Sequence, residues 1–197
     1  VRVLNAMQVD AFVIRHAENG TPESLVPHVQ ASVLNAGDGS HAHPTQALLD
    51  ALTIKRHKGT LEGLTVAICG DVEHSRVARS NIHLLKKFGS QVRIFAPPKL
   101  MPRDLSQLDV PAYDSITEAI RDADVVMMLR IQNERLAQGD FVMPVGEYHA
   151  KYGLNHDKLK AAKPDVIVMH PLPMNRDVEI TSKLADDAQY SVVFEQI

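Results

Sequence analysis

Residues 64–96 read LTVAICGDVEHSRVARSNIHLLKKFGSQVRIFA, and this stretch decides the fold class. It begins with an apolar run, Leu64–Cys69, continues with a segment of helical periodicity, Ser75–Phe88, and ends with a second apolar run, Gln91–Ala96. Gly89 follows the helical segment, and glycine is common just past the C-terminus of a helix. Strands that are apolar throughout and alternate with helices are typical of a parallel sheet covered on both faces.

The same alternation continues toward the C-terminus. The pattern predicts helices at Ile116–Ala123, Asn155–Ala162 and Ser182–Asp187, and strands at Asp124–Leu129, Asp165–Met169 and Ser191–Phe194. Residues 102–111 and 138–152 are less regular and are predicted to be surface loops. We therefore expect an α/β fold with a doubly wound parallel sheet over residues 59–197.

The first 58 residues are predicted to form the C-terminal portion of a second α/β domain and a connecting helix. Val9–Ile14 and Val33–Leu34 are interpreted as short strands. The helix should begin at His43–Pro44, because proline is favoured at the first helical position, and end near Lys58–Gly59.

Composition excludes several classes of protein. A net charge of −3 without a basic tract gives no indication of binding to nucleic acid. No stretch approaches the length of about 20 apolar residues that a membrane span needs. Cys69 is the single cysteine of the 197 residues, so an internal disulfide is excluded and a reducing compartment is favoured.

Polar side chains follow the predicted strands, at the edge where ligands bind in open parallel sheets. These residues are Arg15 and His16, Arg76, Arg130 and Gln132, and His170–Pro173, with His43 and Gln46 at the start of the connecting helix. Arginine offers forked donors to a carboxylate or phosphate, and a helix N-terminus adds a positive end. The set suits an anionic ligand that carries a carbonyl group.

Taken singly, these residues have ordinary interpretations. A lone arginine at a strand end is usually solvated or ion-paired, and His43 alone could cap the helix. A metal pair of His41 and His43 is weakly indicated, since no cysteine or acidic partner lies at ligand spacing. The G-x-G-x-x-G pattern is absent, so a nicotinamide cofactor is not expected. We expect neither a cofactor nor a metal.

Four ordered motifs resemble the catalytic chain of the aspartate carbamoyltransferase family. They are NAGDGSHAHPTQALLD at 35–50, GDVEHSRVARS at 70–80, MMLRIQNERL at 127–136 and MHPLPMNRDVEI at 169–180. Ornithine carbamoyltransferases carry a cysteine in the motif that here reads HPLP, and an S-M-G element that this sequence lacks. Arg130, Gln132, Glu134 and Arg135 match the aspartate type. The resemblance covers nearly the whole chain.

The resemblance implies roles for the residues that would bind carbamoyl phosphate. Arg15 would contact its carbonyl and phosphate oxygens, and His43 would hydrogen-bond the carbonyl oxygen. Gln46 would bind the carbamoyl amide. Pro171 and Leu172 would offer backbone carbonyls to the carbamoyl NH2 group and to the attacking amine.

A second set would bind the acceptor, L-aspartate. Arg76 and Arg130 would hold the two carboxylates of aspartate, with Gln132 and Leu172 assisting. Ornithine has a cationic side chain, which those arginines would repel.

The implied reaction is carbamoyl transfer to the α-amino group of aspartate, an early step of pyrimidine biosynthesis that gives N-carbamoyl-L-aspartate and phosphate. The family also implies a cytoplasmic homotrimer with shared active sites; regulatory chains or pathway enzymes are open as partners. Two alternatives remain open: a carbamoyltransferase for another amino acid, and a non-catalytic subunit that serves assembly.

The sequence departs from the family in two motifs. The S-T-R-T-R run that cradles phosphate and the loop whose lysine reaches a neighbouring subunit are absent, and both are expected upstream of Val1. A final helix is expected after Ile197. We therefore expect residues 1–58 to be the C-terminal part of the carbamoyl phosphate-binding domain and residues 59–197 to be the aspartate-binding domain. The chain by itself is expected to be inactive or nearly so.

Overall fold

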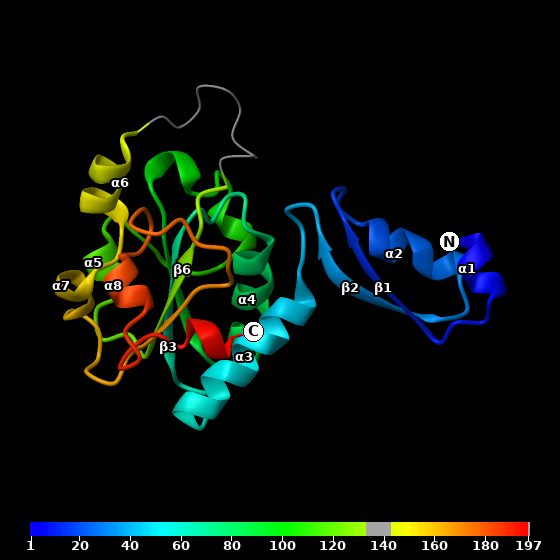
Figure 1. Ribbon diagram of the computed structural model, residues 1–197, viewed down its shortest axis with the longest axis horizontal. Helices are drawn as coiled ribbons and strands as arrows, with labels where there is room; N and C mark the ends of the chain where they lie inside the picture. Colours follow the sequence, from blue (N-terminus) through cyan, green and yellow to red (C-terminus); the bar gives the residue numbers. More distant parts are fainter. Residues whose placement is uncertain (133–142, 197) are drawn as a thin grey trace.

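The computed structural model describes residues 1–132 and 143–196, apart from the side chain of Gln107. It has a larger C-terminal part and a smaller N-terminal part, and helix α3 lies between them (Figure 1). Each part contains one parallel sheet, as the sequence predicts. The α/β class with parallel sheets is therefore confirmed.

The larger part is built on a five-stranded parallel sheet with the order β5-β4-β3-β6-β7. The strands are β3 (Thr65–Gly70), β4 (Gln91–Phe95), β5 (Ala112–Tyr113), β6 (Val125–Leu129) and β7 (Ile167–Met169). After β3 the chain adds strands on one side and then returns to add β6 on the other. The strand order therefore reverses between β3 and β6, which is where open α/β sheets bind ligands.

Helices cover both faces of this sheet. They are α4 (Arg76–Lys87), α5 (Ile116–Ala119), α6 (Val145–Tyr152), α7 (His156–Leu159) and α8 (Ser182–Ala185). Helix α4 lies on one side of the sheet, with α3 beyond it, and α5, α7 and α8 lie on the other (Figure 1). Every residue of β3 and β6 is buried, which explains why both strands are apolar without alternation.

Side-chain caps set where two of these helices begin. The Ser75 side chain accepts a hydrogen bond from the Ala78 N–H at 3.1 Å, before α4. The Asn155 side chain accepts one from the Lys158 N–H at 3.0 Å, before α7. Each bond satisfies a backbone donor that the first turn of a helix leaves unpaired.

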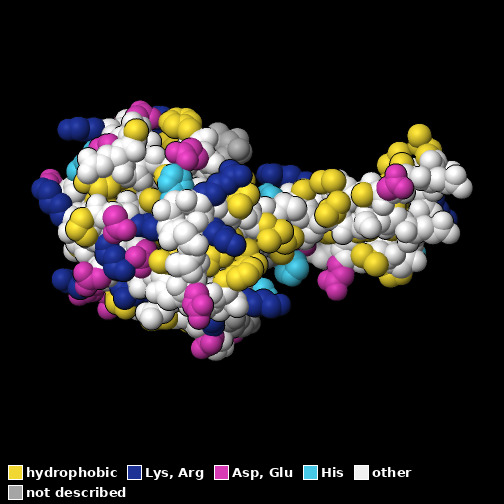
Figure 2. Space-filling view, turned by 90° about the horizontal axis from the view of Figure 1, so that it is seen from below, with side chains coloured by type: hydrophobic (Ala, Val, Ile, Leu, Met, Phe, Trp, Pro, Cys, Tyr) yellow, Lys and Arg dark blue, Asp and Glu magenta, His cyan; other side chains and the backbone are white. Residues whose placement is uncertain are grey.

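The smaller part contains α1 (Arg2–Ala6), β1 (Ala11–His16), α2 (Thr21–Leu25), a 3₁₀ turn (Val26–His28) and β2 (Ser32–Asp38). Strands β1 and β2 are parallel, with a shift of register between Ile14 and His16. Hydrophobic side chains lie on the surface of this part, whereas charged side chains are denser on the larger part (Figure 2).

Helix α3 (Pro44–Lys58) joins the two sheets and packs against α4. It begins at Pro44 and is closed by Gly59 at φ +77°, as the sequence predicts. The amino group of Lys58 contacts the carboxylate of Asp165 at 2.9 Å, and His57 contacts Glu195 at 2.8 Å. Both contacts tie the end of α3 to the larger part.

Two predicted elements are wrong. Ser191–Phe194 is not a strand: Ser191 forms one isolated bridge with Val168, after which the chain turns into the 3₁₀ helix Val193–Glu195. This turn lets the side chain of Gln196 point inward.

The second error concerns residues 138–152, which were expected to be a loop; Val145–Tyr152 is helix α6, and residues 138–142 lie outside the described residues. Tyr148 and Tyr152, four residues apart, are buried against each other with ring centroids 5.3 Å apart.

Candidate active site

A cavity of about 200 Å³ lies where the two parts meet, beyond the carboxyl ends of β1, β6 and β7. Its lining contains every site residue predicted from the sequence, namely Arg15, His43, Gln46, Arg76, Arg130, Gln132, Pro171 and Leu172. Ser75, Val77, Leu129, His170 and Pro173 complete the lining. Residues from five distant segments of the chain are thus brought to one place.

The cavity is strongly positive. Three guanidinium groups line it, those of Arg15, Arg76 and Arg130, and none of the described lining residues is acidic. The N-termini of α3 and α4 also reach its wall, through Gln46 and Arg76. Such a lining favours a ligand with more than one negative charge.

His43 is held as a neutral hydrogen-bond donor. Its Nδ1 accepts a hydrogen bond from the Gln46 N–H at 3.4 Å, so the ring proton lies on Nε2. Burial, followed by the charges of Arg76 and Arg15, lowers the pKa of His43 to about 4. At neutral pH the ring is therefore uncharged and its Nε2–H can donate to a ligand.

Gly37 allows the close approach of two cavity side chains. A Cβ atom at this position would lie 2.9 Å from Cζ of Arg76 and 3.1 Å from Cδ2 of His43. Gly37 also has a φ of +113°, which side chains rarely adopt. The Arg76 guanidinium donates to the Gly39 carbonyl at 3.3 Å, which fixes it against the same loop.

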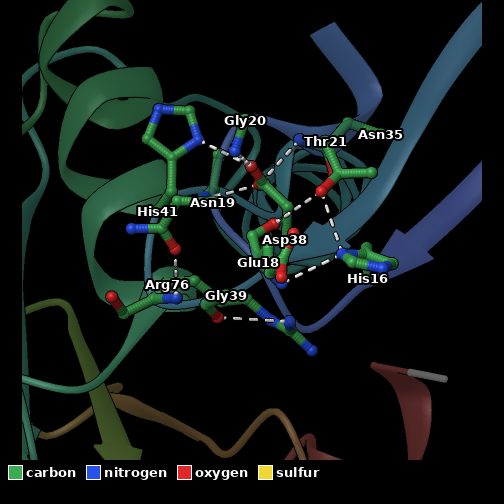
Figure 3. Close-up of polar contacts among 12 residues, drawn as sticks. His16, Glu18, Asn19, Gly20, Thr21, Asn35, Asp38, Gly39, His41 and Arg76 are labelled. Carbon is green, nitrogen blue, oxygen red and sulfur yellow. Dashed lines mark hydrogen bonds and ion pairs between the residues drawn. The ribbon is translucent and has the colours of Figure 1, made fainter. Parts of the chain in front are cut away.

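The loop that carries His43 is organised by a buried carboxylate, Asp38 (Figure 3). Its Oδ2 accepts hydrogen bonds from the Gly20 N–H at 2.6 Å and from His41 Nδ1 at 2.9 Å. Its Oδ1 accepts from Asn35 Nδ2 at 2.8 Å and from the Ala42 N–H at 3.2 Å.

The chemistry of Asp38 agrees with this geometry. Burial raises the pKa of its carboxyl group, but the hydrogen bonds from Asn35, Gly20 and His41 outweigh burial and lower the pKa to about 2. The ionised carboxylate therefore joins the loop after β1 to the loop after β2.

A second buried carboxylate, Asp71 at the end of β3, positions Gln132. Asp71 accepts a hydrogen bond from the Gln132 N–H at 3.1 Å and one from His74 Nδ1 at 2.8 Å. The side chain of Gln132 donates to the His74 carbonyl at 2.9 Å. The backbone after β6 is thereby fixed to the end of β3, its neighbour in the sheet.

The turn after β7 is held by His170. The Leu172 N–H donates to His170 Nδ1 at 3.0 Å, and His170 Nε2 donates to Glu179 at 3.1 Å. Leu172 adopts a φ of +46° in this turn. The turn brings both Pro171 and Leu172 into the cavity wall.

Sequence reasoning missed the buried carboxylates that support the site, among them Asp38, Asp50, Asp71 and Glu179. The available signal was an acidic residue inside or next to an apolar segment, as in ALLDAL and ICGD.

Glu134 and Arg135 lie outside the described residues. In the described part of the chain, no group of three His, Cys, Asp or Glu residues could hold a metal ion. No helix there is long and apolar enough to cross a membrane.

A parallel α/β sheet with an arginine-lined cavity at its switch point defines a binding site for small anions. A family model described as "Aspartate/ornithine carbamoyltransferase, Asp/Orn binding domain" matches residues 62–197. The model described as "Aspartate/ornithine carbamoyltransferase, carbamoyl-P binding domain" matches residues 1–56. The chain belongs to the aspartate/ornithine carbamoyltransferase family.

Curated relatives are of the aspartate type. The chain is 58% identical over 194 residues to the aspartate carbamoyltransferase catalytic subunit of Rhodospirillum centenum, covering 98% of this chain and 61% of that protein. It is 59% identical to the corresponding subunit of Brucella anthropi, with 98% and 60% covered. The chain thus spans about three fifths of the length of these relatives.

Solved structures of both branches share the fold. Aspartate transcarbamoylase from Trypanosoma cruzi with bound phosphate gives a TM-score of 0.82 at 31% identity, covering 100% of this chain and 65% of that one. Ornithine carbamoyltransferase from Pyrococcus furiosus gives 0.81 at 28% identity, with 99% and 64% covered. The fold therefore does not distinguish the two substrates, and the choice between them depends on the site residues.

Proposed function

We propose that the complete polypeptide carrying this chain transfers the carbamoyl group of carbamoyl phosphate to the α-amino group of L-aspartate. The convergence of three arginines, His43 and Gln46 on one cavity carries this proposal. The identity to aspartate-type relatives supports it, as does the fold shared with a T. cruzi enzyme solved with N-(phosphonacetyl)-L-aspartic acid. The products are N-carbamoyl-L-aspartate and phosphate, which places the reaction in pyrimidine biosynthesis.

The cavity residues have separate tasks at the carbamoyl group. The amine attacks the carbonyl carbon and negative charge builds on the carbonyl oxygen. The neutral Nε2–H of His43 and the guanidinium of Arg15 donate to that oxygen, and such donors contribute about 3–4 kcal/mol each. The C–O bond to phosphate then breaks as the carbonyl re-forms, and the departing phosphate takes up the proton that the amine loses. Pro171 and Leu172 direct backbone carbonyls at the carbamoyl NH2 group and the incoming amine.

Aspartate is bound by the larger part of the chain. Arg76 and Arg130 hold its two carboxylates, and Gln132, fixed by Asp71, assists. These charges attract a dicarboxylate and repel the cationic side chain of ornithine. Holding two anions next to each other supplies much of the rate, because the reaction becomes intramolecular in effect.

We assign residues 1–58 to the carbamoyl phosphate-binding domain with its connecting helix, and residues 59–197 to the aspartate-binding domain. The two matched family models support this division. The proposed protein is a cytoplasmic homotrimer whose active sites are shared between subunits.

Substitution of Arg130 tests the proposal. In the complete polypeptide, Arg130→Ala should lower kcat/KM for aspartate by about a thousandfold, because a charge-assisted pair to a carboxylate is lost in a desolvated site. Arg103→Ala, at an exposed arginine outside the cavity lining, is the matched control and should stay within twofold of the parent. Near-normal aspartate kinetics in Arg130→Ala would refute the assignment.

The other two functional alternatives are separated by simple assays. A panel of aspartate, ornithine and N-acetylated amines identifies the acceptor. A non-catalytic subunit would show no turnover with any acceptor, and it would not bind a phosphonate joined to aspartate, a ligand that spans both halves of the cavity.

A further inference from the structure

Asp50 lies beneath the cavity, in α3, and is fully buried. Three side-chain amides donate hydrogen bonds to its carboxylate. Gln46 Nε2 lies 2.9 Å and Gln196 Nε2 lies 2.6 Å from Oδ1, and Asn81 Nδ2 lies 2.6 Å from Oδ2. Asp50 therefore connects a cavity residue, Gln46, to two residues that do not line the cavity.

Backbone groups fix the orientation of two of these amides. Gln196 Oε1 accepts a hydrogen bond from the His170 N–H at 2.9 Å, so its Nε2 must face Asp50. Asn81 Nδ2 also donates to the Val77 carbonyl at 3.1 Å, so its Nδ2 is fixed in the same way. A backbone N–H can only donate and a carbonyl can only accept, so both assignments follow from chemistry. Each carboxylate oxygen of Asp50 is thus an acceptor.

The orientation of Gln46 follows from this network. Its Nε2 is committed to an acceptor, so its Oε1 is the amide atom left for a ligand in the cavity that Gln46 lines. Burial raises the pKa of Asp50, and the hydrogen bonds from Gln196, Asn81 and Gln46 oppose that rise by stabilising the ionised form.

We infer that Asp50 is a positioning residue that makes the site select an acyl phosphate with an NH2 group over the isosteric one with a CH3 group. It does so by keeping Gln46 Oε1, an acceptor, toward the cavity. A carbamoyl NH2 donates to that oxygen, whereas an acetyl CH3 leaves it unpaired. A site built to hydrogen-bond a substrate rejects the analogue that lacks the group, because its own polar atom stays unsatisfied. This inference rests on the proposed function.

The test compares carbamoyl phosphate with acetyl phosphate as donors to aspartate, in the complete polypeptide. The measured quantity is the ratio of the two kcat/KM values, which does not depend on the fraction of protein that is folded. Asp50→Leu has a similar shape and no acceptor, so Gln46 can turn. The preference for carbamoyl phosphate should fall by at least about tenfold. If the Leu variant does not fold, Asp50→Ala removes the same acceptor without overfilling the space, and the same fall is expected.

Asp50→Asn is the matched conservative variant. Its Oδ1 can still accept from Gln46 and Gln196, while its new NH2 group faces Asn81. Asn81 keeps its bond to the Val77 carbonyl, so its Nδ2 and the new NH2 group face each other, which lowers stability but leaves the acceptor of Gln46 in place. The donor preference should therefore stay within threefold of the parent.

Two outcomes separate the inference from the proposed function. If the unsubstituted polypeptide forms no carbamoyl-aspartate, the proposed function fails. If it is active and Asp50→Leu or Asp50→Ala keeps the parent's preference, the inference about Asp50 is overturned while the function stands. A fall of the same size in Asp50→Asn would also overturn it, because charge rather than amide orientation would then decide.

Discussion

The two sheets of this chain differ in how completely they are covered. In the five-stranded sheet, β3 and β6 have no exposed residue. In the two-stranded sheet, Val13 is 71% exposed and Leu34 is 45% exposed, on β1 and β2 respectively. Apolar burial is the main source of stability, so within these 197 residues the smaller sheet gains much less from packing than the larger one.

The two parts of the chain contribute different arginines to the cavity. Arg76 and Arg130 are carried by the well-packed part, and Arg15 is carried by β1. The position of Arg15 relative to His43 is set by the β1–β2 ladder and by the contacts of Asp38. Within these 197 residues, which span about three fifths of the relatives' length, the proposed aspartate end of the site is held by a core, whereas the proposed carbamoyl phosphate end is held by a hydrogen-bonded loop.

The largest difference is expected when the two sheets are truncated at matched positions. Ile68→Ala at the centre of β3, where the side chain is fully buried, should lower the free energy of unfolding by about 3–4 kcal/mol. Val13→Ala on β1 should change it by less than about 0.5 kcal/mol in the 197-residue chain, where this side chain is exposed to solvent. Urea unfolding of both variants measures the two values, and comparable losses would break the comparison.

A smaller effect is expected at Asp38, which supports the loop between the sheets. In Asp38→Asn the new NH2 group must face an N–H donor, either that of Gly20 or that of Ala42, and this costs about 2–3 kcal/mol locally. Amide hydrogen exchange at Gly20 and Ala42 should accelerate, while exchange in β3 stays unchanged. The matched control is Glu18→Gln, at an exposed carboxylate of the same region.

Asp38→Asn should also change the kinetics of the enzyme. In the complete polypeptide, KM for carbamoyl phosphate should rise more than KM for aspartate, because the loop positions His43 next to Arg15. If both KM values rise equally, the loop serves the whole cavity and the division between its two ends is wrong.

The fold could be predicted from the sequence where a local pattern was unambiguous. The apolar run Leu64–Cys69 was predicted as a covered strand, which β3 confirms. Pro44 and Gly59 correctly predicted the two ends of α3. Helix α6 was missed because its apolar signal consists of two tyrosines next to a stretch rich in glycine and proline. The strand at Ser191–Phe194 was wrong because a tertiary contact, the inward turn of Gln196 to Asp50, overrides its local β propensity.

The residues that line the cavity could be predicted from the sequence. Arg15 lies near the end of β1, Arg130 follows β6 and Arg76 begins α4, so topology alone places them at one edge. The residues beneath were not predictable, because Asp50 and Gln196 are 146 positions apart and meet only in the folded chain. Sequence pattern identifies charges that face a ligand, but it does not identify the buried acceptors that orient them.

The smallest expected effect is a loss of folding stability at low pH. It should come from His43, at the start of α3, and not from Asp38, at the end of β2. The pKa of His43 is lowered from 6.5 to about 4 in the folded chain, so between these values the unfolded state binds the extra proton. The contribution of His43 to stability is complete above pH 6.5 and is lost as the pH falls to 4. His43 is only half-buried, and solvent screening keeps the loss under about 1 kcal/mol.

Asp38 behaves differently in the same titration, because its pKa is lowered from 3.8 to about 2 and its contribution persists down to pH 3.8. Between pH 6.5 and pH 4, His43 of the unfolded state should therefore take up a proton and lower stability, while the contribution of Asp38 is unchanged. Urea unfolding at pH 7 and pH 5 should show a shallower pH dependence in His43→Gln, whose side chain is neutral at both values. An unchanged slope in that variant would mean that another group titrates in this range, and that burial and the two arginines do not hold His43 neutral.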